Sequence, residues 1–145
     1  MRVARTTRCK EANTGLTNFT HVFRISLRSA KLVANGNAVT REQRLFASAL
    51  RRNVLCVVAS KDGRGGSLQL EENALIFSSA LDPGHHLVYE LRPARSVWVH
   101  VAAGSVKIFD LTLSVGDSAV VTSDPYVSIN ATEHAELLLI DTHMD

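Results

Sequence analysis

The feature that most constrains the fold of this chain is a series of short apolar runs, separated by turn signals, from residue 53 onward. Runs of this length and spacing are typical of strands in an antiparallel sandwich or barrel. Val97, Val99 and Val101 alternate with Trp98 and His100, which is the period of a strand with one buried face. The sequence therefore predicts an all-β fold. Its predicted strands are Asn53–Ala59, Ser67–Leu70, Ala74–Ala80, His86–Leu91, Ser96–Val101, Ser105–Phe109, Leu111–Leu113, Ser118–Val121, Tyr126–Asn130 and Ala135–Ile140.

The N-terminal third is less regular. Apolar and polar residues alternate over Val22–Leu27, which predicts one further strand. Thr40 and Gln43 have the spacing of a capping box, with Thr40 as the N-cap of a short helix. We expect this helix to turn three apolar side chains toward the core: Leu45, Phe46 and Leu50.

The length of 145 residues indicates one domain. We expect residues 21–145 to form it and residues 1–20 to form an N-terminal arm, mobile or swapped onto a second copy. Residues 1–45 hold nine basic and two acidic residues, whereas residues 46–145 hold seven basic and twelve acidic ones. A basic arm on an acidic body can contact nucleic acid, its own body or a second copy. The arm lacks aromatic residues among its basic ones for base stacking, so nucleic acid is disfavoured.

The composition also bears on the compartment. No apolar run reaches the roughly 20 residues that span a bilayer, so we expect no membrane association. The basic N-terminus has no continuous apolar segment or clear cleavage site of a signal peptide, and we expect a cytoplasmic protein. The two cysteines do not form a Cys-x-x-Cys pair, so a structural zinc site is not indicated.

Several segments, taken in order, resemble the C-terminal cupin domain of pirin-like, quercetinase-type bicupins. The resemblance covers about residues 40–145, begins at Val22 at the earliest and leaves residues 1–20 unmatched. It implies a cupin-like antiparallel β-barrel, also called a double-stranded β-helix or jelly roll. It also implies that the family's metal site and quercetinase activity belong to a separate N-terminal cupin, which we expect this chain to lack. The segments are Val57–Leu68, Leu81–Gly84, Val97–Val106, Leu113–Asp117 and Ala135–Asp141.

Two segments, Gly84–Gly104 and Gly116–Ala131, keep the glycine framework in which a metal-binding cupin carries three histidines and a glutamate. An arginine at a ligand position repels a cation, and a valine offers no lone pair. We therefore expect no metal, no cofactor and no catalytic residue in this barrel. The four ligand positions hold Glu90, Arg92, Val97 and Val127.

The orientation of the first of these segments stays open in the sequence. The apolar alternation of Leu87, Tyr89 and Leu91 favours an inward position for these residues instead of Glu90 and Arg92. A one-residue slip of register separates the two arrangements. The candidate contacts for a small molecule in the barrel are Tyr89, Glu90 and Arg92.

Other motifs have plainer readings. His85 and His86 are adjacent and follow a turn, so they point to opposite faces and do not suggest a metal pair. Trp98 and His100 share one strand face, and they are either an interface patch, which we favour, or core residues. The glycine-rich stretch 63–66 lacks the lysine of a phosphate-binding loop and predicts a hairpin loop.

The leading hypothesis is a non-catalytic, metal-free cupin-like module for binding or oligomerisation. We expect a homodimer, because half of a two-domain protein leaves an apolar surface uncovered. One alternative is a quercetin 2,3-dioxygenase-like or other small-molecule enzyme with an atypical site. The other is nucleic-acid binding through the basic arm.

Overall fold

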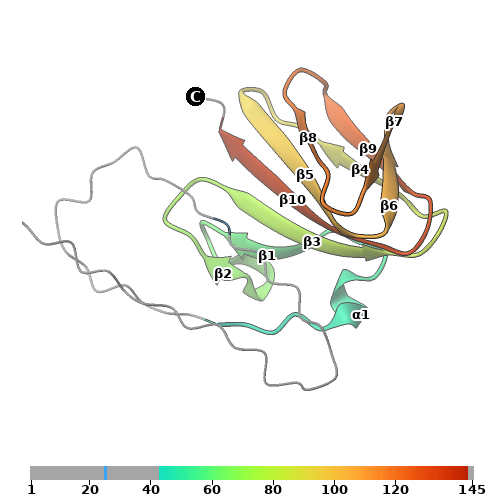
Figure 1. Ribbon diagram of the computed structural model, residues 1–145. Coiled ribbons are helices and arrows are strands. Elements are labelled where there is room, and N and C mark those ends of the chain that lie inside the picture. The colour runs from blue at the N-terminus through green and yellow to red at the C-terminus, as the bar shows by residue number, and fades with distance from the viewer. Residues whose placement is uncertain (1–24, 26–42, 144–145) are drawn as a thin grey trace, which may run out of the picture.

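The computed structural model describes Ile25 and residues 43–143 (Figure 1). Ten strands dominate this part of the chain. The helical elements are α1 (Ser48–Arg51) and the single 3-10 turn η1 (Arg64–Gly66). The strands are β1 (Cys56–Ser60), β2 (Leu68–Gln69), β3 (Leu75–Leu81), β4 (His86–Glu90), β5 (Arg95–Ala103), β6 (Ser105–Ile108), β7 (Leu111–Ser114), β8 (Ser118–Val121), β9 (Tyr126–Ala131) and β10 (Ala135–His143).

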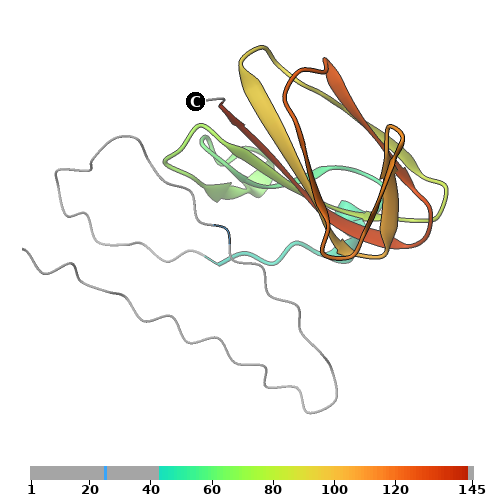
Figure 2. The ribbon, with the colours of Figure 1, turned by 45° about the horizontal axis from the view of Figure 1, so that its top comes forward.

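The strands form two sheets. The larger has the order β2-β1-β3-β10-β5-β8, and the smaller has the order β4-β9-β6-β7. All neighbouring strands are antiparallel except β1 and β2, which pair in parallel over two residues. Figures 1 and 2 show the smaller sheet facing the β10-β5-β8 part of the larger one, while β1 and β2 extend the larger sheet beyond it. The predicted all-β fold is confirmed.

The main core fills the space between the two sheets. Val97, Val99 and Val101 are completely buried, whereas Trp98 between them is 47% exposed, as the alternation predicts. Leu137 and Leu139 of β10 add to the same core from the neighbouring strand. Full burial of one such side chain contributes about 1.5–3 kcal/mol, so the facing of β5 and β10 is strongly specified.

The larger sheet also buries apolar side chains on its other face. Ile76 and Ile140 are paired neighbours there and pack with Ala59. Leu68 and Leu70, at and just after β2, cover this smaller cluster. The short β2 therefore caps the outer face of the sheet near β1.

The predicted strands agree closely with the observed ones. The predicted run Ser118–Val121 is β8 itself. β5 is longer than predicted because Arg95 and Ala103 still pair with β10. β2 keeps only two residues of its predicted run, since it pairs with β1 alone.

The N-terminal helix was predicted too early in the sequence. Residues 43–47 are not helical, and α1 begins at Ser48 without a side-chain cap. Leu45 is 96% exposed and Leu50 is 62% exposed, so their predicted core positions are wrong. The strands already fill the core, and the four-residue helix lies outside it, beside β3 (Figure 1). Thr40 and the predicted strand Val22–Leu27 lie outside the described residues, except Ile25, which is not in a strand.

Candidate functional site

The four cupin ligand positions divide into two pairs. Val97 and Val127 are completely buried and belong to the main core. Glu90 and Arg92 are exposed. Of the four ligand positions, the two that lie in the barrel interior therefore hold aliphatic side chains.

The orientation of β4 decides which residues take the inward positions. Leu87 and Tyr89 are half-buried and pack against the core, and Leu91 packs there just after the strand. Tyr89 pairs directly with Val127 of β9. The slipped arrangement is the one the structure has. Tyr89 and Glu90, two of the three candidate ligand contacts, lie on opposite faces of β4.

A buried polar cluster lies at this end of the barrel. The Tyr89 hydroxyl donates a hydrogen bond of 2.5 Å to Oδ2 of Asp141. Arg95 Nε donates to Oδ1 of Asp141, and Arg95 Nη2 donates to the Asp141 carbonyl at 2.9 Å. The Asp141 and Arg95 side chains are only 2% and 9% exposed. The cluster joins β4 of the smaller sheet to β5 and β10 of the larger one.

The cluster also fixes the protonation of Tyr89. Burial raises the pKa of the Tyr89 hydroxyl well above its ordinary value, and its hydrogen bond to the Asp141 carboxylate raises it further. Tyr89 is therefore a neutral hydrogen-bond donor near neutral pH. Its hydroxyl ties the two sheets together through Asp141.

These residues do not fit a divalent metal. Among the inward side chains of β4 and of the cupin ligand positions, only Tyr89 carries an oxygen, and this hydroxyl is protonated and bonded to Asp141. The Asp141 carboxylate is neutralised by Arg95, whose positive charge opposes a cation at the same place. Among residues 43–143, no three His, Cys, Asp or Glu side chains gather to hold a metal ion.

Sequence reasoning missed Arg95 and Asp141. A signal for both was present, because each has the parity of the buried residues in its strand. Arg95 precedes the inward Val97 by two residues, and Asp141 follows the inward Leu139 by two. Charged residues of opposite sign at inward positions predict a buried pair if the strands are neighbours, and β5 and β10 are.

The other candidate residues lie on the surface. The His85 amide donates to the Asp82 carbonyl at 3.1 Å in the expected turn, and His86 is exposed with its Nε2 2.9 Å from Ser128 Oγ. Trp98 and His100 point outward from β5, which excludes the core alternative for this pair. His100 Nδ1 lies 2.8 Å from Ser118 Oγ on the neighbouring strand β8.

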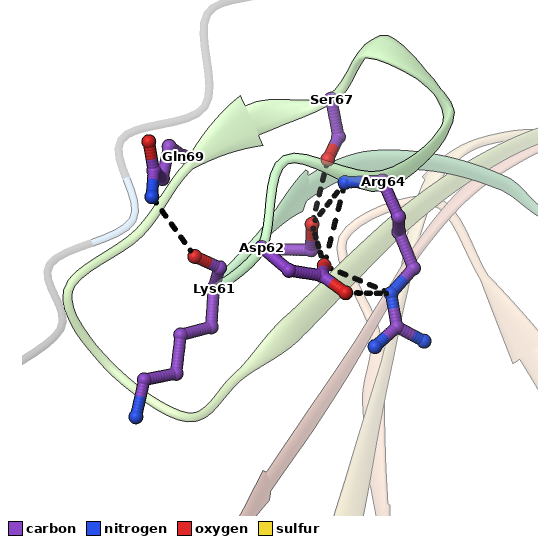
Figure 3. Close-up of polar contacts among 6 residues, drawn as sticks. Lys61, Asp62, Arg64, Ser67 and Gln69 are labelled. Carbon is purple, nitrogen blue, oxygen red and sulfur yellow. Dashed lines mark hydrogen bonds and ion pairs between the residues drawn. The ribbon is translucent and has the colours of Figure 1, made fainter.

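The glycine-rich stretch forms a self-bonded loop, but not the predicted hairpin loop, because β1 and β2 pair in parallel. Gly63 and Gly65 adopt positive φ angles of 65° and 62°, which let the chain turn twice within a few residues. Figure 3 shows the Asp62 carboxylate facing Arg64, whose Nε donates to both carboxylate oxygens at 2.9 and 3.0 Å. Ser60 Oγ donates to Asp62 Oδ1 at 3.0 Å. The Arg64 guanidinium is therefore paired with Asp62 within the loop.

The family model of the quercetinase C-terminal cupin domain matches residues 57–142. The chain belongs to this family. The predicted resemblance to this domain is confirmed.

Curated relatives support the assignment. Quercetin 2,3-dioxygenase of Escherichia coli O157:H7 is 28% identical over 134 residues, which are 92% of this chain and 55% of the relative. The enzyme of E. coli strain K12 gives the same identity and coverage. The chain thus spans about half the length of the curated relatives it matches. The alignment of 134 residues covers more of the chain than the part from Val22 to the C-terminus. The similarity therefore includes some of the first 21 residues, which lie outside the range expected from the sequence.

Solved structures agree with the fold. The crystal structure of E. coli YhhW is 30% identical, with a TM-score of 0.67 over 72% of this chain and 43% of YhhW. The structure of bacterial pirin YhhW in complex with nickel(II) matches equally well, over 44% of its chain. E. coli YhaK, at 24% identity and a TM-score of 0.56, shows the fold alone. The predicted cupin-like architecture is confirmed.

Two further expectations concern membrane association and the N-terminal arm. Within the part of the chain that the structure describes, no helix is long and apolar enough to cross a membrane. Of the basic segment 1–45, only Ile25 and residues 43–45 are described, so the proposed arm of residues 1–20 lies outside the described residues.

Proposed function

We propose that this chain is a metal-free, non-catalytic cupin module that acts by binding and self-association. The observation that carries the proposal is the content of the cupin ligand positions. Val97 and Val127 are completely buried core residues, and Glu90 and Arg92 are exposed. A cupin metal needs several nitrogen, oxygen or sulfur donors around one point, and valine has none.

The alternative is an enzyme that acts on flavonols, as the names of the E. coli relatives suggest. Oxygen chemistry of this kind needs a metal with open coordination positions. The family resemblance assigns that metal to a separate N-terminal cupin, and the chain spans about half of those relatives. At this end of the barrel interior the Tyr89 hydroxyl is bonded to the Asp141 carboxylate, and Arg95 neutralises that carboxylate.

Oxygen uptake with quercetin separates the two. We expect no turnover above a heat-denatured control, with or without added nickel, iron or copper. A full-length E. coli quercetin 2,3-dioxygenase serves as the positive control in the same assay. Metal-dependent turnover by this chain would overturn the non-catalytic proposal.

Self-association is proposed through the outer face of the larger sheet. Register pairs Ile140 with Trp98, and Trp98 with Val120, in one row across β10, β5 and β8. Trp98 and Val120 are 47% and 64% exposed. The next row pairs Leu138 with His100 and His100 with Ser118, so both rows lack lysine, arginine, aspartate and glutamate.

A second copy is the occupant that we propose for this face. An uncharged surface with an aromatic centre is typical of the core of an interface. The outer edge of β8 is also uncharged along Ser118–Val121, so two copies related by a twofold axis meet without like-charge repulsion. Trp98 and His100 are the proposed contact residues.

A further inference from the structure

A groove lies outside the barrel, where α1 meets the end of β3 and the start of β10. Its volume is about 470 Å³, which falls in the range of small-molecule pockets. We name it the α1 groove. Four alanines, Ala49, Ala80, Ala103 and Ala135, give it an apolar lining with room for a ligand.

Polar groups surround the α1 groove and largely neutralise one another. Asp82 Oδ2 accepts hydrogen bonds from Arg52 Nε at 2.9 Å and from Asn53 Nδ2 at 2.7 Å. His134 Nδ1 lies 3.5 Å from the other Asp82 oxygen. Arg52 and Asp82 therefore form the wall of the groove as a neutral pair.

A smaller hollow of about 190 Å³ adjoins the groove and shares Ala103 and Glu136 with it. Arg51 lines this hollow with its side chain 20% exposed. Its Nη1 bonds to Ser78 Oγ at 2.9 Å, but its buried Nε has no hydrogen-bond partner among the described residues. The carboxylate of Glu136 comes only to 4.0 Å from Arg51 Nη1. An unpaired buried donor is costly, and the Arg51 guanidinium, which lines the hollow and is partly exposed, is a group there that can donate to an acceptor oxygen.

We propose that the α1 groove and this hollow form one binding site for a small organic monocarboxylate with a flat apolar body. The body lies against the four alanines, and a carboxylate oxygen accepts from Arg51. One partly neutralised arginine matches a single negative charge, whereas the second charge of a phosphate dianion would be repelled by Glu136, which lines the same hollow. This inference rests on the binding role proposed above and gives it a site other than the barrel mouth.

Benzoate is the probe, with benzamide as its uncharged counterpart and inorganic phosphate as the plain anion. In titrations of the isotope-labelled full chain followed by amide NMR, we expect saturable benzoate shifts at Ala49, Ala80, Ala103 and Ala135. Benzamide and phosphate should bind at least about tenfold more weakly, as expected when a charge-assisted bond or the apolar contact is lost. The absence of saturable shifts at these alanines would overturn the proposal.

Variants locate the site. Arg51→Met keeps the apolar stem and removes the donor, and it should weaken benzoate binding about tenfold or more. Ala49→Leu fills the groove from an exposed helix position without removing a polar contact, and should weaken binding even if Arg51→Met fails to fold. Arg92→Met, at the barrel mouth, is the matched control and should bind like the parent chain. Unchanged binding in Ala49→Leu, or loss in Arg92→Met with shifts around Tyr89, would contradict the site. Metal content, measured on the same samples, tests the metal-free proposal separately.

Discussion

The hydroxyl of Tyr89 and the carboxylate of Asp141 form a 2.5 Å hydrogen bond that joins the two sheets of the barrel. Arg95 holds the same carboxylate from the neighbouring strand. A buried charge pair contributes little net stability when intact but is costly to break. The cluster therefore fills one end of the barrel interior with side chains that are already bonded to one another.

Removal of the Asp141 charge should destabilise the fold. Asp141→Asn leaves the Arg95 guanidinium buried without its counter-charge, and we expect a loss of about 3–5 kcal/mol in the free energy of unfolding. Urea unfolding followed by circular dichroism measures it. Asp62→Asn is the matched control, because the Asp62–Arg64 pair is half exposed on both sides and its loss should cost much less. Equal losses in the two variants would contradict a buried cluster.

The Tyr89 hydroxyl should lose its proton at a higher pH than an ordinary tyrosine. Tyr89 and Tyr126 are the two tyrosines of the chain, so Tyr126→Phe leaves Tyr89 as the only phenol to follow by ultraviolet absorbance. Burial and the bond to Asp141 raise the pKa of Tyr89 in the folded state above its unfolded value of 10.0. Its contribution to stability is therefore complete below about pH 10 and is lost as the pH rises further. The folded chain should form phenolate at a higher pH than the urea-denatured chain. Coincident titrations would show that Tyr89 is not held by Asp141.

Gly104 should tolerate no side chain. It has a φ of +71°, and an added Cβ would lie 1.9 Å from the backbone oxygen of His134. Gly84 has a similar φ of +78° but nothing within 4 Å of the same position, so the two glycines separate conformational strain from collision. We expect Gly84→Ala to cost about 1–2 kcal/mol, and Gly104→Ala to cost far more and to prevent folding. Thermal unfolding compares them, and similar melting temperatures would contradict the close approach of the two turns.

The chain should be a homodimer through the face that carries Trp98. Trp98→Ser should give a monomer in sedimentation equilibrium, because it removes the aromatic centre of that face. Leu111→Ser is the matched control, since Leu111 is 65% exposed on the other sheet, and it should stay dimeric. A parent chain that is monomeric throughout would reject the dimer.

Trp98 also reports on its own burial, because it is the single tryptophan of the chain. Its fluorescence should shift to longer wavelengths as dilution dissociates the dimer. A chain without residues 1–20 shows whether the arm contributes. A dimer that persists in that chain rejects only a required role for the arm.

The sequence predicted most strands because the alternation of β5 and the turn signals between runs are local features. The predicted helix start was wrong, because Thr40 and Gln43 have capping-box spacing but residues 43–47 are not helical and α1 begins only at Ser48. No local pattern could tell that the strands leave no core position for Leu45 or Leu50.

The site was only partly predictable. Spacing identified Val97 and Val127 as interior positions, but the facing of Tyr89 depends on the register of β4 with β9, which is a long-range property. The cluster of Tyr89, Arg95 and Asp141 combines residues up to 52 positions apart in the sequence. No sequence motif predicted the α1 groove, because its lining residues come from segments that are far apart in the sequence.

The most direct test of the metal-free proposal is elemental analysis of the chain after expression in metal-supplemented medium. Two of the cupin ligand positions hold the buried valines Val97 and Val127, and Arg95 neutralises Asp141. We therefore expect far less than one equivalent of nickel, iron, copper or zinc after mild chelation. The His85→Ala/His86→Ala double variant should give the same low value. One equivalent retained by the parent chain after chelation and lost in that double variant would contradict the proposal.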